Sequence, residues 1–268
     1  MPELNSLALQ GNYDTTINII GGLSNCGVIY SAIDAYFGQG DAIRDLATTR
    51  NEFNLRTEKS KIRVELAVRR SFLEFYNQDH KDLIQALFQH NLPLPERELI
   101  LFWQFALNNR LFREISSQVY IKAYLSGRSG LTKDDIAAYI KDAVSHNKAF
   151  DLKWSESTIN TLSSKYLNIM TKLNFVEGKR IKSFKQIRPT TESLSLFLYF
   201  AKLYNPGNNN ILNNELLPLS FMVTEDIKDR LKKLSMKGFF NMDFNGIALN
   251  IELIHSYKGI CDVLYKQS

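Results

Sequence analysis

The sequence has few cysteines, prolines and glycines for its length, and each shortage excludes a class of fold. Its 268 residues include only two cysteines, Cys26 and Cys261, with 6 prolines and 13 glycines. Two cysteines are too few for a disulfide scaffold or a structural zinc site, so we expect a reducing, intracellular compartment. The scarcity of proline and glycine favours many helices joined by short loops.

Long apolar runs and an N-terminal basic segment are also missing. The first 41 residues contain no Lys or Arg, so they lack the basic region of a signal peptide. The best candidate for a membrane span, residues 17–37, contains Asn18, Asn25, Asp34 and several glycines, which transmembrane helices rarely tolerate. We therefore expect a cytoplasmic protein without a membrane partner.

Motifs of catalysis and cofactor binding are absent from the sequence. It has no phosphate-binding loop and no Gly-x-Gly-x-x-Gly, His-Glu-x-x-His, Cys-x-x-Cys or Gly-x-Ser-x-Gly pattern. Glu177-Gly178-Lys179, with Asp151 upstream, resembles the carboxylates and lysine of metal-dependent nucleases. However, Gly178 is expected in the turn of a short hairpin and Asp151 before a helix. We predict no enzymatic activity, no catalytic residues, no metal site and no cofactor.

Charge is distributed unevenly, although the net charge is only +5. Residues 1–41 carry −4, residues 42–70 carry +4 and residues 151–190 carry +5, whereas residues 71–150 and 191–268 are neutral. Clustered cations are typical of proteins that bind polyanions such as DNA. The alternative is a pair of solvated helix faces, which produces the same local bias.

The first basic window has the pattern of a helix-turn-helix. Residues 28–36 have the apolar spacing of a helix, Asp41 can cap a short second helix, and Thr57 can cap a longer third one. On the third helix we expect Ile62 and Leu66 to face the core. Its outward cations would meet DNA as the second helix of a helix-turn-helix does, although a plain three-helix packing unit fits equally well. The DNA-binding candidates in this window are Arg56, Lys59, Lys61 and Arg63.

The second basic window has the pattern of a winged helix. Ser155 can cap a helix that continues to Leu173, followed by a strand, a turn at Gly178 and another strand. A basic hairpin beside a polar helix face suits contacts with phosphates and base edges. The connector at residues 146–154 is longer than the usual turn of a helix-turn-helix. The DNA-binding candidates are Ser157, Thr158, Asn160 and Lys165 on the helix, and Lys179, Arg180, Lys182, Lys185 and Arg188 on the hairpin.

The rest of the chain is predicted to form the core and a second hairpin. Residues 82–125 are aromatic and have the helical spacing of a bundle core. Thr224 can cap a later helix, and Asn245-Gly246 predicts a hairpin after it. The second hairpin region is neutral, which favours packing or partner contact over DNA reading. An Asn-rich surface loop at residues 205–214 is the best domain boundary. The expected fold is mainly α, a helical bundle with helix-turn-helix and winged-helix elements and two short β-hairpin wings, in regions 1–80, 81–204 and 205–268.

Three parts of the chain resemble the BrxA family of the BREX phage-defence systems. They are residues 54–63 with Arg69-Arg70, the aromatic middle through residues 118–122, and residues 154–159 with 173–176. The resemblance covers most of the chain. It implies a small, all-helical DNA-binding protein with helix-turn-helix and winged-helix parts and no enzymatic activity. Such a protein works alongside methyltransferase, ATPase and phosphatase-like components.

We therefore expect a component of a BREX-type system that binds double-stranded DNA, mainly through phosphates, with other BREX components as further candidate partners. A protein–protein scaffold of the same complex is an alternative, but a scaffold would not need cations concentrated on two helix–turn elements. A winged-helix transcription regulator is another alternative. It would need a dimer and an outward helix rich in Arg, Asn or Gln, for which Asn160 is thin support.

Overall fold

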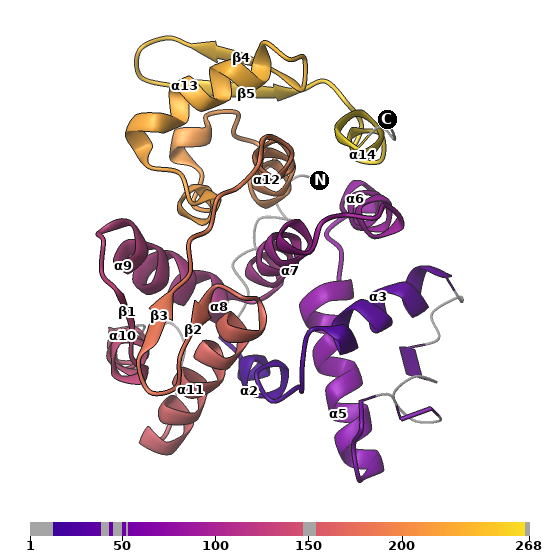
Figure 1. The fold of residues 1–268 in the computed structure, drawn as a ribbon, viewed down its shortest axis with the longest axis vertical. Coiled ribbons are helices and arrows are strands. Elements are labelled where there is room, and N and C mark those ends of the chain that lie inside the picture. The colour runs from indigo at the N-terminus through magenta and orange to yellow at the C-terminus, as the bar shows by residue number, and fades with distance from the viewer. Residues whose placement is uncertain (1–12, 39–42, 45–49, 52, 147–153, 266–268) are drawn as a thin grey trace. The chain divides into compact units, whose positions relative to one another are not determined.

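Helices dominate the structure, a computed structural model that describes residues 13–38, 43–44, 50–51, 53–146 and 154–265. Two small antiparallel sheets complete it (Figure 1). The predicted mainly α class is confirmed. Two compact units alternate along the chain. We call them the N-terminal unit, Gln10–Glu74 with Gln104–Gln186, and the C-terminal unit, Met1–Leu9 with Phe75–Trp103 and Ile187–Ser268.

The N-terminal unit combines helices with a three-stranded sheet of order β1-β3-β2, in which both pairings are antiparallel. Its helices are α2 (Thr16–Ile20), α3 (Gly27–Gly38), α5 (Glu58–Val68), α8 (Arg110–Ile115), α9 (Lys122–Leu125), α10 (Lys133–His146) and α11 (Glu156–Lys172). π-Helical turns lie at Arg69–Leu73 and Ser116–Ile121, and the strands are β1 (Gly130–Leu131), β2 (Val176–Glu177) and β3 (Lys182–Phe184).

The predicted starts of two helices in this unit are confirmed by their capping bonds, and a third helix has a similar cap. Thr57 Oγ1 accepts the peptide N–H of Ser60 at 3.2 Å, and Ser155 Oγ accepts that of Thr158 at 3.2 Å. At α10, Asp135 Oδ2 accepts the peptide N–H of Thr132 at 2.7 Å. Each bond satisfies backbone donors that the first helical turn leaves without a partner.

The predicted core face of α5 is wrong. Ile62 is 43% exposed and Leu66 is 48% exposed. The buried positions are instead Val64, Ala67 and Val68, which lie on the opposite side of the helix. Small β-branched and alanine side chains allow this close packing, whereas the two longer apolar side chains remain outside. The short helix predicted from Asp41 lies mostly outside the described residues.

The C-terminal unit contains the second hairpin. Its helices are α6 (Gln78–Gln89), α7 (Leu94–Asn108) as far as Trp103, α12 (Thr191–Tyr204), α13 (Thr224–Ser235) and α14 (Ile260–Leu264), with 3₁₀ turns at Ile211–Asn213 and Leu217–Ser220. The strands are β4 (Phe240–Phe244) and β5 (Leu249–Leu253), which pair antiparallel with Phe244 opposite Leu249.

The second hairpin forms at Asn245-Gly246, as predicted, but its loop spans residues 245–248. Asn245 Oδ1 accepts the peptide N–H groups of Ile247 at 3.1 Å and Ala248 at 2.8 Å. These side-chain bonds close the loop and leave Ile247 outside the return strand, 87% exposed. The N-cap position of α13 is Val223, so Thr224 begins the helix and is not its predicted cap.

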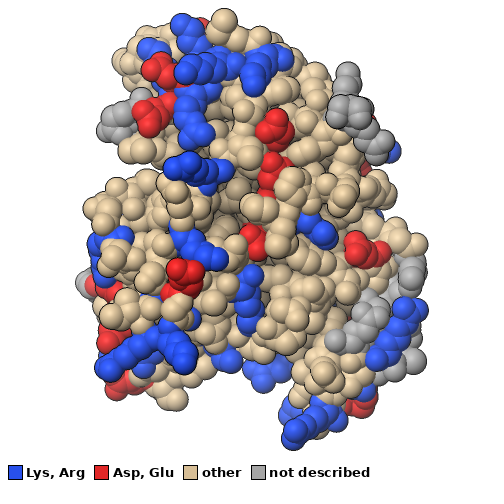
Figure 2. Space-filling view, in the orientation of Figure 1, with Lys and Arg blue, Asp and Glu red and all other residues tan. Residues whose placement is uncertain are grey.

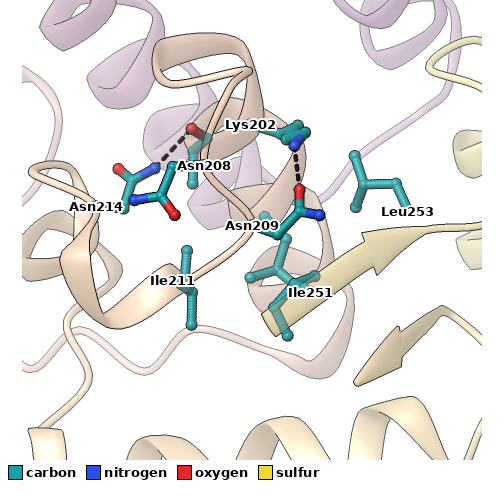
Figure 3. Close-up of a pocket in the computed structure, with 9 residues that line it drawn as sticks. Lys202, Asn208, Asn209, Ile211, Asn214, Ile251 and Leu253 are labelled. Carbon is teal, nitrogen blue, oxygen red and sulfur yellow. Dashed lines mark hydrogen bonds between the residues drawn. The ribbon is translucent and has the colours of Figure 1, made fainter. Parts of the chain in front are cut away.

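The Asn-rich segment predicted as a surface loop is exposed at Pro206, Gly207, Asn209 and Asn213, and its other residues pack against the C-terminal unit. Asn214 is buried and its Nδ2 donates to the carbonyl of Ala201 at 2.8 Å. Lys202 Nζ donates to Asn209 Oδ1, and burial lowers the pKa of the lysine (Figure 3). The cavity among these side chains is about 20 Å³, which is room for one water molecule and not for a substrate.

The aromatic core explains why the units alternate along the chain, whereas three consecutive regions were predicted. Trp103 packs on Phe197 and Phe200 of the C-terminal unit, with ring centroids 5.5 and 5.6 Å apart. Two residues later in α7, Phe105 stacks on Phe112 of the N-terminal unit at 4.3 Å. Neighbouring residues of one apolar helix therefore pack in the cores of different units. In the described part of the chain, no helix is long and apolar enough to cross a membrane.

Candidate nucleic-acid interface

The basic hairpin follows α11 directly and supplies the edge strand β2 and the central strand β3 of the three-stranded sheet. Its turn depends on Gly178, whose φ is +94°. A Cβ atom at this position would lie 2.6 Å from the carbonyl oxygen of Ile181, so a side chain cannot be accommodated without a shift. Strand β1 was missed by the sequence analysis, because only Gly130-Leu131 forms it and two residues carry no periodicity.

The cations of the hairpin divide into two groups by their contacts. Lys179 and Arg180 lie exposed in the turn. Lys182 Nζ donates to the Gly178 carbonyl at 2.6 Å, and Lys185 Nζ donates to Asn174 Oδ1 within the same hairpin. Lys182 and Lys185 therefore stabilise the hairpin, whereas Lys179 and Arg180 project from it. Figure 2 shows cations gathered over this part of the molecule, at the lower left.

Arg188 was predicted to belong to the same hairpin, but the structure places it differently. Residues from Ile187 onward belong to the C-terminal unit, whereas Lys179 to Lys185 belong to the N-terminal unit. Arg188 is exposed, just before α12. The cations that the structure brings together on the hairpin are therefore four of the five candidates.

An open groove of about 650 Å³ runs along the first half of α11. Three of the four predicted helix residues, Ser157, Asn160 and Lys165, line it together with Lys133 of α10. The fourth, Thr158, is half-buried, and its hydroxyl lies 3.0 Å from that of the capping Ser155. The other lining residues are Glu156, Thr161 and Ser164.

One carboxylate lies in this otherwise polar and cationic groove, and it has a partner. Glu156 Oε1 is 2.8 Å from Lys141 Nζ. The hydrogen bond and the charge of this lysine lower the pKa of the Glu156 carboxyl. Because the pair is exposed, its main effect is to offset the negative charge at the groove rather than to stabilise the fold.

The second half of α11 is covered by α2, which the sequence analysis did not foresee. Lys172 Nζ donates to the carbonyl of Gly21 at 2.9 Å, and burial lowers the pKa of this lysine. A Cβ atom on Gly21 would lie 2.5 Å from the carbonyl oxygen of Lys165, so α2 approaches α11 as closely as only glycine permits. The N-terminal half of α11 remains open along the groove, whereas in the second half only Asn168 and Thr171 are exposed.

The candidates of the first basic window form a different kind of surface. Arg56, Lys59 and Arg63 are exposed, whereas Lys61 is half-buried and pairs with Glu58 Oε1 at 2.6 Å. Lys59 and Arg63 lie on the same face of α5 as Ile62 and Leu66, which are exposed. This mixed apolar and cationic stripe, Lys59, Ile62, Arg63 and Leu66, is called the α5 face below.

The nuclease-like pattern lies only partly within the described residues. Asp151 lies outside them, and Glu177 Oε2 is 4.0 Å from Lys185 Nζ, beside the hairpin. Nowhere in the described ranges do three His, Cys, Asp or Glu side chains gather so that they could hold a metal ion.

The comparisons with known proteins give one match. The family model BrxA matches residues 38–199, more than half of the chain. The matched range includes α5, the aromatic middle, α11 and the basic hairpin. No curated protein and no solved structure matches the chain.

Proposed function

Because the chain belongs to the BrxA family and is thus a BREX-associated protein, we propose that it binds double-stranded DNA through the α11 groove and the basic hairpin. Most of the binding free energy comes from contacts with phosphates, and sequence preference is weak. Other BREX components are its proposed protein partners.

The order of elements around α11 carries this proposal. The strand β1 is followed by α10, α11, β2 and β3, and the last strand pairs with both others. A helix pair followed by a hairpin, with a short strand before the pair, supports assignment of this part as a winged helix. In this architecture α11 is the helix that enters the major groove, and its first residues face the base edges.

The chemistry of the accessible residues agrees with phosphate contact. Lys179 and Arg180 are exposed at the hairpin turn, where two charges can reach one DNA backbone. Ser157 and Asn160 offer a hydroxyl and an amide beside the exposed start of α11. The positive end of the helix dipole at this start also favours an anion. Lys165 adds a further cation along the groove.

The test is a titration of a fluorescent duplex with the full-length protein at several salt concentrations. The logarithm of the binding constant should fall with the logarithm of salt by about 0.9 per phosphate contact. Duplexes of different sequence should bind with similar affinity. Absence of binding at low salt, or binding that does not respond to salt, would contradict the proposal.

We further propose that the protein has no enzymatic activity. The lack of a phosphate-binding loop and of other catalytic sequence motifs supports this. Supercoiled plasmid incubated with the protein and Mg²⁺ or Mn²⁺ should remain intact. Cleavage that is lost in Glu177→Ala would show that the nuclease-like pattern is functional.

A protein–protein scaffold is the second candidate function, and the α5 face favours it. Ile62 and Leu66 lie one helical turn apart, and both are exposed between cations. Exposed apolar pairs are characteristic of protein contacts, whereas phosphates offer nothing for them to pack against. The two functions are compatible, because they use different residues. DNA contact by Arg56, Lys59, Lys61 and Arg63 remains the competing proposal for this helix.

A further inference from the structure

A group of cations lies at the end of α13, in a region whose net charge is zero. Residues 230–242 contain four cations and no acidic residue. Lys232, Lys233 and Lys237 are exposed. Figure 2 shows cations gathered over α13, in the upper part of the view. The neutral total of residues 191–268 therefore conceals a separation of charge on the surface.

These cations belong to an arrangement that repeats the one around α11. Helix α13 is followed by β4 and β5, and Asn250 of β5 also forms an antiparallel bridge with Asn210, which precedes the helix. The peptide N–H of Ile251 donates to the Asn209 carbonyl at 2.9 Å, which extends this contact. β5 therefore pairs with β4 on one side and with Asn210, which precedes α13, on the other. In the same way, β3 pairs with β2 on one side and with β1, which precedes α10 and α11, on the other.

We propose that Lys232, Lys233 and Lys237 form a second surface for the phosphates of double-stranded DNA, separate from the α11 hairpin. The inference rests on the proposed function. Three exposed ammonium groups within six residues, with no carboxylate between them, favour a polyanion. Lysine stems are long and flexible, so each ammonium can reach a phosphate independently.

Stabilisation of the helix dipole accounts for only part of this group. Lys232 and Lys233 lie in the last turn of α13, where cations stabilise the negative end of a helix. Lys237 lies beyond Ser235, the last helical residue, and gains little from the dipole. A fourth cation, Arg230, is directed elsewhere, because its Nη2 donates to the Pro189 carbonyl at 3.3 Å.

The mode of contact differs from that of α11. Asp226 and Asp229 lie in the first half of α13 and are exposed, so this half repels DNA and cannot read base edges as the start of a recognition helix does. Contact is therefore restricted to the DNA backbone. It adds affinity without sequence preference.

The test uses the full-length chain with all three lysines reversed, Lys232→Glu/Lys233→Glu/Lys237→Glu, in the salt titration described above. The salt slope should fall by about 2.7, since each phosphate contact contributes about 0.9. Combined with reversal of Lys179 and Arg180, the same changes should leave only the salt dependence that comes from Lys165 and the start of α11. A Lys→Gln triple at the same positions gives the same readout if the reversed variant does not fold.

Two matched controls separate phosphate contact from other causes. Lys258→Glu reverses an exposed cation outside the group, and Met236→Gln removes an apolar side chain, 81% exposed, from within it. Both should bind DNA as the wild-type protein does. If the wild type binds duplex DNA and the folded triple variant keeps its full salt slope, the second surface is disproved. If Met236→Gln weakens DNA binding as much as the triple variant does, the proposal is also overturned, because the contact would then be apolar. A wild-type protein that binds no duplex contradicts the proposed function itself.

Discussion

The two hairpin regions have the same order of elements but place their charges differently. Around α11, the cations lie in the turn between the strands, and the start of the helix is open and polar. Around α13, the turn between the strands is uncharged and carries Ile247, whereas the cations lie in the last turn of the helix and just after it. The same order of elements can therefore place its exposed cations either in the turn of the hairpin or at the end of the helix. Architecture alone does not identify the DNA-contacting residues.

Among changes at the two hairpin turns, the largest expected effect comes from reversing the charge of the first. Lys179→Glu/Arg180→Glu replaces two attractive phosphate contacts with repulsive ones, so the affinity should fall on every duplex sequence and the salt slope should fall by about 1.8. The control Lys122→Glu/Lys258→Glu reverses two exposed cations elsewhere. If both variants bind DNA equally well, the hairpin turn is not a contact.

The two turn glycines allow a matched test of stability. Both have positive φ, +94° at Gly178 and +96° at Gly246. A Cβ atom added at Gly178 would lie close to the carbonyl oxygen of Ile181, whereas one added at Gly246 would have no neighbour within 4 Å. Gly246→Ala should therefore lower the free energy of unfolding by about 1 kcal/mol, because of the backbone conformation alone. Gly178→Ala should lower it by at least about 2 kcal/mol, because the added methyl group also meets the carbonyl. Urea denaturation measures both. Equal losses would show that the hairpin backbone relaxes around the added methyl group.

The uncharged turn of the second hairpin can be made to resemble the first. Ile247→Lys places a cation at the position where the first hairpin carries its exposed charges, and it removes an apolar side chain that is 87% exposed. If the C-terminal region lies near DNA in the complex, the salt slope should rise by up to about one. Folding stability should change by less than about 0.5 kcal/mol, because the site is on the surface. An unchanged slope would limit the second surface to the end of α13.

The smallest expected effect concerns the start of α10. Hydrogen bonds from Thr132 and the charge of Arg128 outweigh the effect of burial and lower the pKa of the Asp135 carboxyl. Its folded pKa is thus below its unfolded pKa. The stabilisation is present above the unfolded value and is lost as the pH falls through the folded one.

Asp135→Asn should therefore cost about 1 kcal/mol at neutral pH, as loss of a capping interaction does. The difference from the wild type should shrink in acid. Urea denaturation at several pH values measures it. A difference that stays constant with pH would show that the charge of Asp135 does not matter.

The sequence alone determined the helical class, the aromatic core and the starts of two helices. These features depend on local chemistry, namely the apolar spacing and the hydroxyl or carboxylate that accepts the first peptide N–H groups. Ser155 and Thr57 both cap helices as predicted. The positions of both hairpin turns also follow from Gly178 and Asn245-Gly246, because those residues tolerate the conformations that the turns require.

Only the tertiary structure decided which helix faces are open. The spacing of Ile62 and Leu66 predicted a buried face, but packing selected the opposite side of α5, where Val64, Ala67 and Val68 lie. Similarly, no local pattern indicates that α2 packs against the second half of α11 through Gly21. Nor does a local pattern show that the lysines at the end of α13 are exposed, away from the acidic residues that balance them in the net charge. Contacts between residues far apart in sequence determine exposure, and a window of neighbouring residues does not contain them.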